Sequence, residues 1–282
     1  MRKNVNIILG SMRSGTTIIH KSLCQGENTN PYISESWFLV DLLRLYHWGL
    51  ERYEIRHSDQ FGAVDNFQNL IQHNINYYIS AVSIKYQDPE VLFLKHPELS
   101  YYALDLILAI KDLKFIVIVR DPRDVIASIY KVKERHIKSK IVTPQTQTQD
   151  IEAHCKNYLN YYKEIFKHQK FINKRIIFVK YEDFILNTES EIERISLFTN
   201  AKYNIEKVKN SENCDTKSLN FDRNKRMKDP LSSGFWSEDY LKPLTDKNIG
   251  DYKNILPASD IDFIENYLYD FGKNFGYWKD QK

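Results

Sequence analysis

Four runs of mostly apolar residues lie along the chain, and each is followed by residues with helical spacing. The runs are NVNIIL (4–9), VLFLK (91–95), KFIVIVR (114–120) and RIIFVK (175–180). Strands that are apolar on both faces are typical of a parallel sheet, and the helices between such strands cover those faces. After the third run, one helical stripe is formed by Val125, Ile126, Ile129 and Val132. The pattern predicts an α/β fold in a single domain.

Two regions interrupt this alternation. Residues 36–90 are rich in Tyr, His, Asn and Gln, and we expect helices and loops inserted between two strands. Residues 200–258 are polar, with few periodic apolar positions. In an α/β protein that binds a nucleotide, excursions of this kind usually build the pocket for a second substrate.

Composition narrows the class of protein. A chain of 282 residues with 42% hydrophobic residues can bury a substantial core, and a net charge of +3 does not predict a nucleic-acid partner. Cys24, Cys155 and Cys214 are odd in number and widely spaced, which argues against a disulfide framework and a zinc site. We find no run that would span a membrane and no room for a signal peptide before the first strand, so we expect a cytoplasmic protein without a transmembrane anchor.

The loop GSMRSGTT, residues 10–17, follows the first strand. It fits the phosphate-binding pattern G-x-x-x-x-G-K-[ST] except that Thr16 replaces the lysine. A glycine-rich turn before a helix points backbone N–H groups at one anion, and Arg13, Ser14 and Thr17 add further donors. Without the lysine that grips a γ-phosphate, the loop suits a nucleotide whose 5′-phosphate carries something other than a triphosphate chain. The alternative is an ordinary strand-to-helix turn.

A second candidate site is RDPRDVIASIY, residues 120–130, at the end of the third strand. Arg120 ends the strand where a metal-binding acid would usually stand, at the sheet edge where ligands of open α/β folds bind. Ser128 follows eight positions later on the next helix. A guanidinium with a hydroxyl can bind a second, separate phosphate. The alternative for Arg120 is a salt bridge at the strand end.

Together, GSMRSGTT and RDPRDVIASIY resemble the motifs of sulfotransferases that use 3′-phosphoadenosine 5′-phosphosulfate (PAPS), in the bacterial and tyrosylprotein branches. The segments at 179–200 and 271–277 are similar to later parts of the same family. The resemblance implies one sulfotransferase domain over residues 1–282, with a P-loop NTPase-like fold and a parallel sheet of about five strands. Residues 36–90 would then form the acceptor pocket, and residues 200–258 would cover the nucleotide.

The resemblance also implies roles for individual residues. The 5′-phosphosulfate would lie against Ser14, Gly15, Thr16 and Thr17, with Arg13 at the bridging oxygen, and the 3′-phosphate against Arg120 and Ser128. Lys95, at the family's K-x-P position, would stabilise the transition state. GFW at 234–236 resembles a late loop, so Arg226 and Trp236 are expected to cover the nucleotide. Sulfuryl transfer of this kind implies no metal.

Two residues compete for the role of the base that takes the proton from the acceptor hydroxyl. Glu35 resembles the catalytic glutamate of the tyrosylprotein and bacterial branches, and an unperturbed carboxylate is ionised at neutral pH. His96 directly follows Lys95, whereas the small-molecule branch has K-T-H. Because side chains alternate along a strand, we expect Lys95 and His96 not to converge on one atom. We therefore favour Glu35.

The expected activity is transfer of a sulfuryl group to a hydroxyl of a carbohydrate, lipid or secondary metabolite. The alternatives are a degenerate P-loop kinase and a non-catalytic nucleotide-binding module. The basic run from Lys131 to Lys140 suits an acidic glycan, although a solvated helix face explains it better. Trp37, Tyr46, His47 and Trp48 are candidate acceptor-pocket aromatics, although core packing explains at least half of them better.

Overall fold

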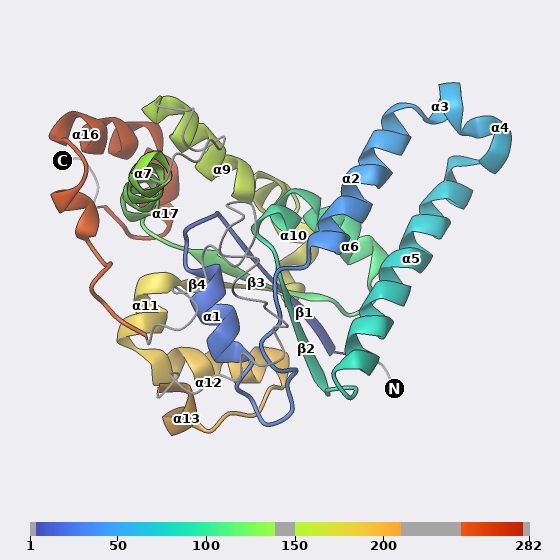
Figure 1. Ribbon diagram of the computed structural model, residues 1–282, viewed down its shortest axis with the longest axis horizontal. Coiled ribbons are helices and arrows are strands. Elements are labelled where there is room, and N and C mark those ends of the chain that lie inside the picture. The colour runs from blue at the N-terminus through green and yellow to red at the C-terminus, as the bar shows by residue number, and fades with distance from the viewer. Residues whose placement is uncertain (1–3, 139–149, 210–243, 279–282) are drawn as a thin grey trace.

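The computed structural model describes residues 4–138, 150–209 and 244–278. Its centre is a parallel sheet in the order β2-β1-β3-β4 (Figure 1). The strands are β1 (Asn4–Gly10), β2 (Val91–Lys95), β3 (Lys114–Val119) and β4 (Ile176–Lys180). These are the four runs that the sequence identified. The resemblance implied about five strands, and the described residues hold four.

Strand register brings the two candidate motifs to one edge of the sheet. Gly10 pairs with Ile118 across β1 and β3, and Ile8 pairs with Lys95 across β1 and β2. Because all the strands run parallel, the loop after β1, the end of β2 and Arg120 after β3 lie at the same carboxyl edge. This placement follows from the pairing alone, before any side chain is considered.

Helices cover both faces of the sheet, as the apolar strands predict. On one face the side chains of Ile8, Ile116 and Ile118 share a core with Ile19 and Phe184. That cover is formed by α1 (Thr16–Leu23), α11 (Tyr181–Leu186), α12 (Thr188–Thr199) and α13 (Ile205–Lys209). The alternating side chains of the same strands face the second core. The molecule is a single α/β domain.

The second face carries the helices that follow β2 and β3 and those near the C-terminus. They are η1 (Pro97–Tyr102), α6 (Ala103–Ala109), α7 (Pro122–Lys138), α9 (Ile151–Lys167), α10 (Gln169–Ile172), η2 (Asn173–Arg175), η5 (Asp251–Asn254), α16 (Ala258–Tyr267) and α17 (Tyr269–Asn274). The stripe predicted on α7 is buried, from Val125 to Val132. The buried face of α9 consists largely of Tyr158, Tyr161 and Tyr162. The pattern of apolar residues in the sequence did not predict this aromatic face.

The region 36–90 forms the expected helical insertion, here called the arm. Its helices are α2 (Trp37–Glu51), α3 (Tyr53–Arg56), α4 (Ser58–Phe61) and α5 (Val64–Lys85). Figure 1 shows α2 and α5 side by side at one side of the molecule, with α3 and α4 at their far ends. A single apolar stripe of α5, which includes Phe67, Ile71 and Ile75, is buried. Residues 200–258 lie partly outside the described residues.

Candidate active site

The loop between β1 and α1 has a shape that only glycine permits at two positions. Gly10 has φ +137°, and a Cβ there would lie 2.5 Å from the carbonyl oxygen of Ile118. Gly15 has φ +91°, and a Cβ there would lie 2.3 Å from the ring of Tyr181. A side chain at either position would be strained by its backbone angle and would collide with its neighbour. The loop therefore packs tightly between β3 and the start of α11.

Neighbouring elements hold the first half of this loop. Ser100 of η1 accepts a hydrogen bond from Gly10 N at 3.1 Å, and the Tyr162 hydroxyl accepts one from Ser11 N at 3.4 Å. Both the backbone N–H and the hydroxyl of Ser14 donate to the carbonyl of Ser11. Ser14 thus shapes the loop. At the N-terminus of α1, Gly15 provides no side-chain cap, and the N–H groups of a first helical turn are of the kind that binds anions.

The two predicted phosphate motifs are in direct contact. Arg120 donates from Nη1 to the carbonyl of Arg13 at 3.2 Å. The Nε of Arg13 donates in turn to Oγ of Ser128 at 3.1 Å. Residues about a hundred positions apart in the sequence therefore form one cluster at the sheet edge.

Arg120 is a buried cation held mainly by neutral groups. Its Nη2 donates to the carbonyl of Asn248 at 2.6 Å, and its guanidinium carbon lies 4.4 Å from the centre of the Tyr181 ring. The closest carboxylate oxygen, from Asp124, is 4.0 Å away. The Nε of Arg120 is buried and has no hydrogen-bond partner. The salt-bridge alternative for Arg120 is thus present in part, as a long ion pair with Asp124, beside contacts with neutral groups.

Asp124, in the first turn of α7, fixes the segment that contains Asn248. Its carboxylate accepts hydrogen bonds from Gly250 N at 2.8 Å and from Tyr252 N at 3.0 Å. Burial raises the pKa of Asp124, and these two backbone hydrogen bonds partly offset that effect. The carboxylate therefore joins α7 to the chain that carries a partner of Arg120.

On the other side of the loop, Lys95 joins β2 to Glu35, which directly precedes the arm. Its Nζ donates to Oε1 of Glu35 at 2.6 Å and to Oγ1 of Thr17 at 3.0 Å. The lysine side chain is fully buried, whereas 21% of the Glu35 side chain is exposed. Burial opposes ionisation of Glu35, but Lys95 and His96 outweigh it and hold the pKa of Glu35 below its ordinary value. The carboxylate is ionised at neutral pH and lies beside the phosphate loop.

His96 lies on the far side of the same carboxylate. Its Nε2 is 3.8 Å from Oε2 of Glu35, and its ring packs edge-on against Trp37 with centroids 4.2 Å apart. Burial lowers the pKa of His96 to about 4, an effect that Glu35 opposes and Lys95 reinforces. Lys95 and His96 meet different oxygens, as expected, yet both contact one carboxylate. Strand alternation did not foresee this because Glu35 reaches between them from another segment.

Several residues that shape the site were not identified from the sequence. Tyr181 lies directly after β4, so its position at the carboxyl edge was a signal that could have been used. Ser100, Tyr162 and Asn248 act through contacts between distant segments, and nothing in the local sequence marks them. Arg226 and Trp236, with the GFW segment, lie outside the described residues.

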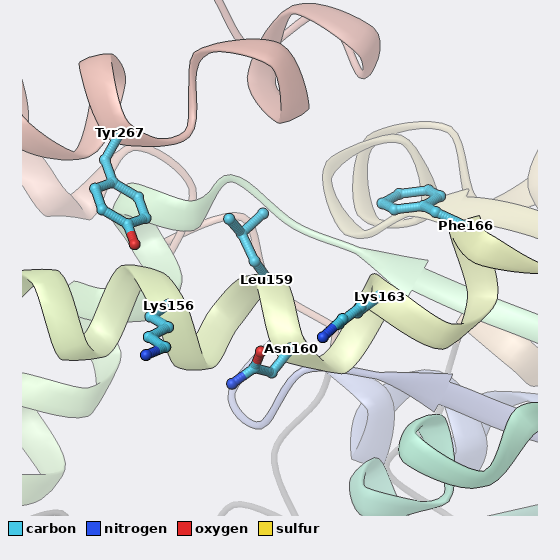
Figure 2. Close-up of a pocket in the computed structure, with 6 residues that line it drawn as sticks. All are labelled: Lys156, Leu159, Asn160, Lys163, Phe166 and Tyr267. Carbon is cyan, nitrogen blue, oxygen red and sulfur yellow. The ribbon is translucent and has the colours of Figure 1, made fainter.

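A separate cavity lies away from this cluster. It has a volume of about 430 Å³ between α9 and α16, and Figure 2 shows the residues that line it. They are Lys156, Leu159, Asn160, Lys163, Phe166 and Tyr267. None of the predicted site residues is among them, so the candidate site is the sheet edge.

Within the described residues, no group of three or more His, Cys, Asp or Glu side chains is placed to hold a metal ion. No helix in those ranges is long and apolar enough to cross a membrane.

Comparison with solved structures shows the same fold elsewhere. The sulfotransferase domain of the Synechococcus PCC 7002 olefin synthase has 18% sequence identity and a TM-score of 0.55, with 94% of each chain covered. A sulfotransferase domain from the curacin biosynthetic pathway has 14% identity and a TM-score of 0.59, with 95% of this chain and 98% of that chain covered. Mouse sulfotransferase SULT7A1, solved with PAP, has 12% identity and a TM-score of 0.51, with coverages of 96% and 84%.

No curated protein matches the sequence significantly. The sequence model of one protein family, the sulfotransferase domain family, matches residues 4–275, which is nearly the whole chain. That range includes the loop after β1, Lys95 at the end of β2 and Arg120 after β3. The chain therefore belongs to the sulfotransferase domain family.

Proposed function

We propose that this protein transfers a sulfuryl group from PAPS to a hydroxyl group of a small-molecule or glycan acceptor. The contact between the two phosphate motifs carries the proposal. Arg13 accepts from Arg120 through its carbonyl and donates to Ser128 through its side chain. A nucleotide with phosphates at both its 5′ and 3′ ends matches two adjoining anion sites of this kind.

The residues present fit such a nucleotide. The free N–H groups at the start of α1, with Gly15, Thr16 and Thr17, would hold the 5′-phosphate. A phosphate near Arg120 would satisfy its buried, unpartnered Nε, and Ser128 would supply a neutral donor beside it. Ser14 contributes by shaping the loop. When bound, PAPS supplies the sulfuryl group and the leaving phosphate, and the PAP complex of the mouse relative supports this choice of nucleotide.

Glu35 is the proposed base. Its Oε1 accepts a hydrogen bond from Lys95, so Oε2 remains to take the proton of the acceptor hydroxyl. Lys95 also donates to Thr17 and thereby places its positive charge between the base and the phosphate loop. Arg13 and Lys95 are fixed cationic donors in a position to stabilise charge that develops on the leaving group. These protein cations replace the lysine and metal of a kinase site.

We further propose that residues 1–282 form one sulfotransferase domain. The arm, with Trp37 beside Glu35, would line the acceptor pocket, and residues in 200–258, including Arg226 and Trp236, would cover the nucleotide. Acceptors would be carbohydrates, lipids or secondary metabolites, and we place the enzyme in the cytoplasm. The aromatic side chains of the arm suit each of these acceptor classes by stacking or apolar contact.

The test compares nucleotides by thermal shift. At about a hundred times its Kd, a specific ligand stabilises the folded protein by about 2.7 kcal/mol. Adenosine 3′,5′-bisphosphate (PAP) is expected to raise the Tm strongly, and ATP with Mg²⁺ weakly. Stabilisation by ATP–Mg²⁺ together with its turnover would instead establish the kinase alternative.

Transfer is tested with labelled PAPS and a library of metabolites and glycans analysed by mass spectrometry. A product heavier by one sulfuryl group, absent with a Glu35→Gln variant, supports the proposal. Tight PAP binding with no product from any acceptor would favour the non-catalytic module.

A further inference from the structure

We infer that His96 is a positioning residue, which holds the Glu35 carboxylate through its Nε2–H and does not act as the base. The inference rests on the proposed function, because it assigns the base of that same reaction. It reverses the role that a histidine next to Lys95 would suggest.

The tautomer of His96 follows from its hydrogen bond to the backbone. Glu98 N donates to Nδ1 of His96 at 3.1 Å, at the start of η1. An acceptor nitrogen carries no proton, so the neutral imidazole must carry its proton on Nε2. The ring is neutral at physiological pH because burial lowers its pKa to about 4. The charged groups around it are Glu35, Lys95, Arg44 and Asp41, whose effects partly cancel.

A base needs a free lone pair, and His96 has none to offer. Its single lone pair faces Glu98 N, and its other nitrogen already carries a proton. The residue is also 2% exposed, and Trp37 packs against the edge of its ring. An acceptor hydroxyl at the surface therefore meets the partly exposed carboxylate of Glu35 rather than the imidazole.

The proton on Nε2 lies near the carboxylate of Glu35. Nε2 is buried without a hydrogen-bond partner, and Oε2 of Glu35 lies 3.8 Å away. A movement of about half an ångström would bring the pair into hydrogen-bond range. Lys95 binds Oε1 from the other side. The carboxylate is thus held between an ammonium and an imidazole N–H, and both favour its charged form.

The transfer step balances with His96 unchanged. The acceptor oxygen forms its bond to sulfur, and its proton passes to Oε2 of Glu35. The bond between sulfur and the 5′-phosphate oxygen breaks, and its electron pair leaves with that phosphate. His96 keeps its Nε2 proton throughout and keeps the carboxylate oriented.

Two substitutions separate the functions of the two ring nitrogens. His96→Asn keeps an acceptor for Glu98 N but removes the donor toward Glu35. His96→Gln keeps an N–H that can reach Glu35. We expect kcat within about threefold of wild type for His96→Gln and about tenfold to a hundredfold lower for His96→Asn, with KM little changed, as for loss of a hydrogen bond to a charged group. His168→Asn, at a histidine directly after α9 and outside the arm, is the matched control.

The pH profile gives a readout that a merely structural role would not move. Loss of the His96 donor removes support for the ionised form of Glu35, so the acidic limb of kcat/KM moves to higher pH in His96→Asn and stays in place in His96→Gln. Loss of that limb in both variants, with equal and severe losses of kcat, would show that His96 is the base and overturn the inference.

A spectroscopic test does not depend on turnover. In ¹⁵N-histidine-labelled protein, the imidazole ¹⁵N shifts of His96, assigned by their absence in His96→Gln, should report protonated Nε2 and unprotonated Nδ1 between pH 6 and 8. A protonated Nδ1 would refute the inference even in an active enzyme. Conversely, the expected tautomer in a protein that does not bind PAP would mean that the proposed function, and not the hydrogen-bond assignment, is wrong.

Discussion

The phosphate loop and the arm lie on either side of Glu35 and Lys95, the residues just before the arm and at the end of β2, yet they are built in different ways. The loop and Arg120 lie at strand ends. Sheet register fixes their positions, together with the hydrogen bonds that Gly10 N and Ser11 N donate to Ser100 and Tyr162. The arm packs against the core through one face of its helices and leaves Trp37 45% and Ile55 88% exposed. The fixed backbone of the loop suits the nucleotide site proposed above. The surface of the arm, proposed to face the acceptor, can be changed without disturbing the sheet.

Replacing Glu35 gives the largest expected effect and separates the two regions most clearly. Glu35→Gln removes the proton acceptor but keeps the size of the side chain, so we expect transfer to fall by about a thousandfold, within the range for general-base catalysis. Glu35 takes no part in the contacts among Arg13, Arg120 and Ser128, so the affinity for PAP should stay within about threefold. The measurements are steady-state transfer from labelled PAPS and calorimetric titration with PAP.

The control for this variant is Glu152→Gln, at an exposed glutamate of α9 outside the arm, and it should match wild type in both assays. If Glu35→Gln weakened PAP binding as strongly as it slowed transfer, Glu35 would belong to the nucleotide side of the site. The contrast between the loop and the arm would then fail.

A smaller effect is expected from Arg120→Lys, which probes the loop side alone. Lysine keeps the charge but loses the planar set of donors, so affinity for PAP should fall by about ten- to thirtyfold. Affinity for adenosine 5′-monophosphate, which lacks the 3′-phosphate, should change by less than about threefold. Both ligands are measured by calorimetry, with Arg52→Lys on the arm as the matched control.

Equal losses for the two ligands would carry a different meaning. Arg120 also donates to the carbonyls of Arg13 and Asn248. An equal loss would show that it maintains the shape of the loop and does not bind the 3′-phosphate.

Much of the loop side could be predicted from sequence because its signals are local. Apolar runs located all four strands, and the spacing from Gly10 to Thr17 identified the loop after β1. The parallel pairing then brings Arg120 to that loop, since strand ends in a parallel sheet share an edge. Residue types and strand order were sufficient for this part of the site.

The acceptor side could be predicted only in part. The sequence and the family resemblance named Glu35, Lys95 and His96, but not that one carboxylate would lie between the other two. That arrangement depends on how the segment after α1 crosses the end of β2, a tertiary contact with no local signature. Tyr162 was missed for a similar reason, because its helix turns tyrosines rather than aliphatic residues to the core.

The smallest expected effect is on the free energy of unfolding as the pH changes. It comes from two buried histidines: His20, which contacts Phe93 of β2, and His96, which directly follows β2. Burial, reinforced by Lys95, lowers the pKa of His20 to about 3, and burial lowers that of His96 to about 4. Both values lie below the ordinary 6.5, so the unfolded chain binds more protons and acid favours unfolding. The stability that these neutral rings contribute is present above about pH 6.5 and is lost as the pH falls toward 4 and 3. We expect about 1 kcal/mol per histidine between pH 6 and 5.

Urea unfolding at pH 7, 6 and 5 measures this loss. In His20→Gln the free energy of unfolding should fall less steeply between pH 6 and 5 than in wild type, whereas the exposed-site variant His73→Asn should keep the wild-type slope. Burial also lowers the pKa of His136 and His154, so a single variant removes only part of the total. The Glu35 carboxylate does not add to this window, because its pKa is lowered and its contribution is lost only at more acidic pH. An unchanged slope in His20→Gln would mean that the His20 ring is charged in the folded protein. The contact with the Phe93 carbonyl raises the pKa of His20, but burial lowers it more, so we expect a neutral ring.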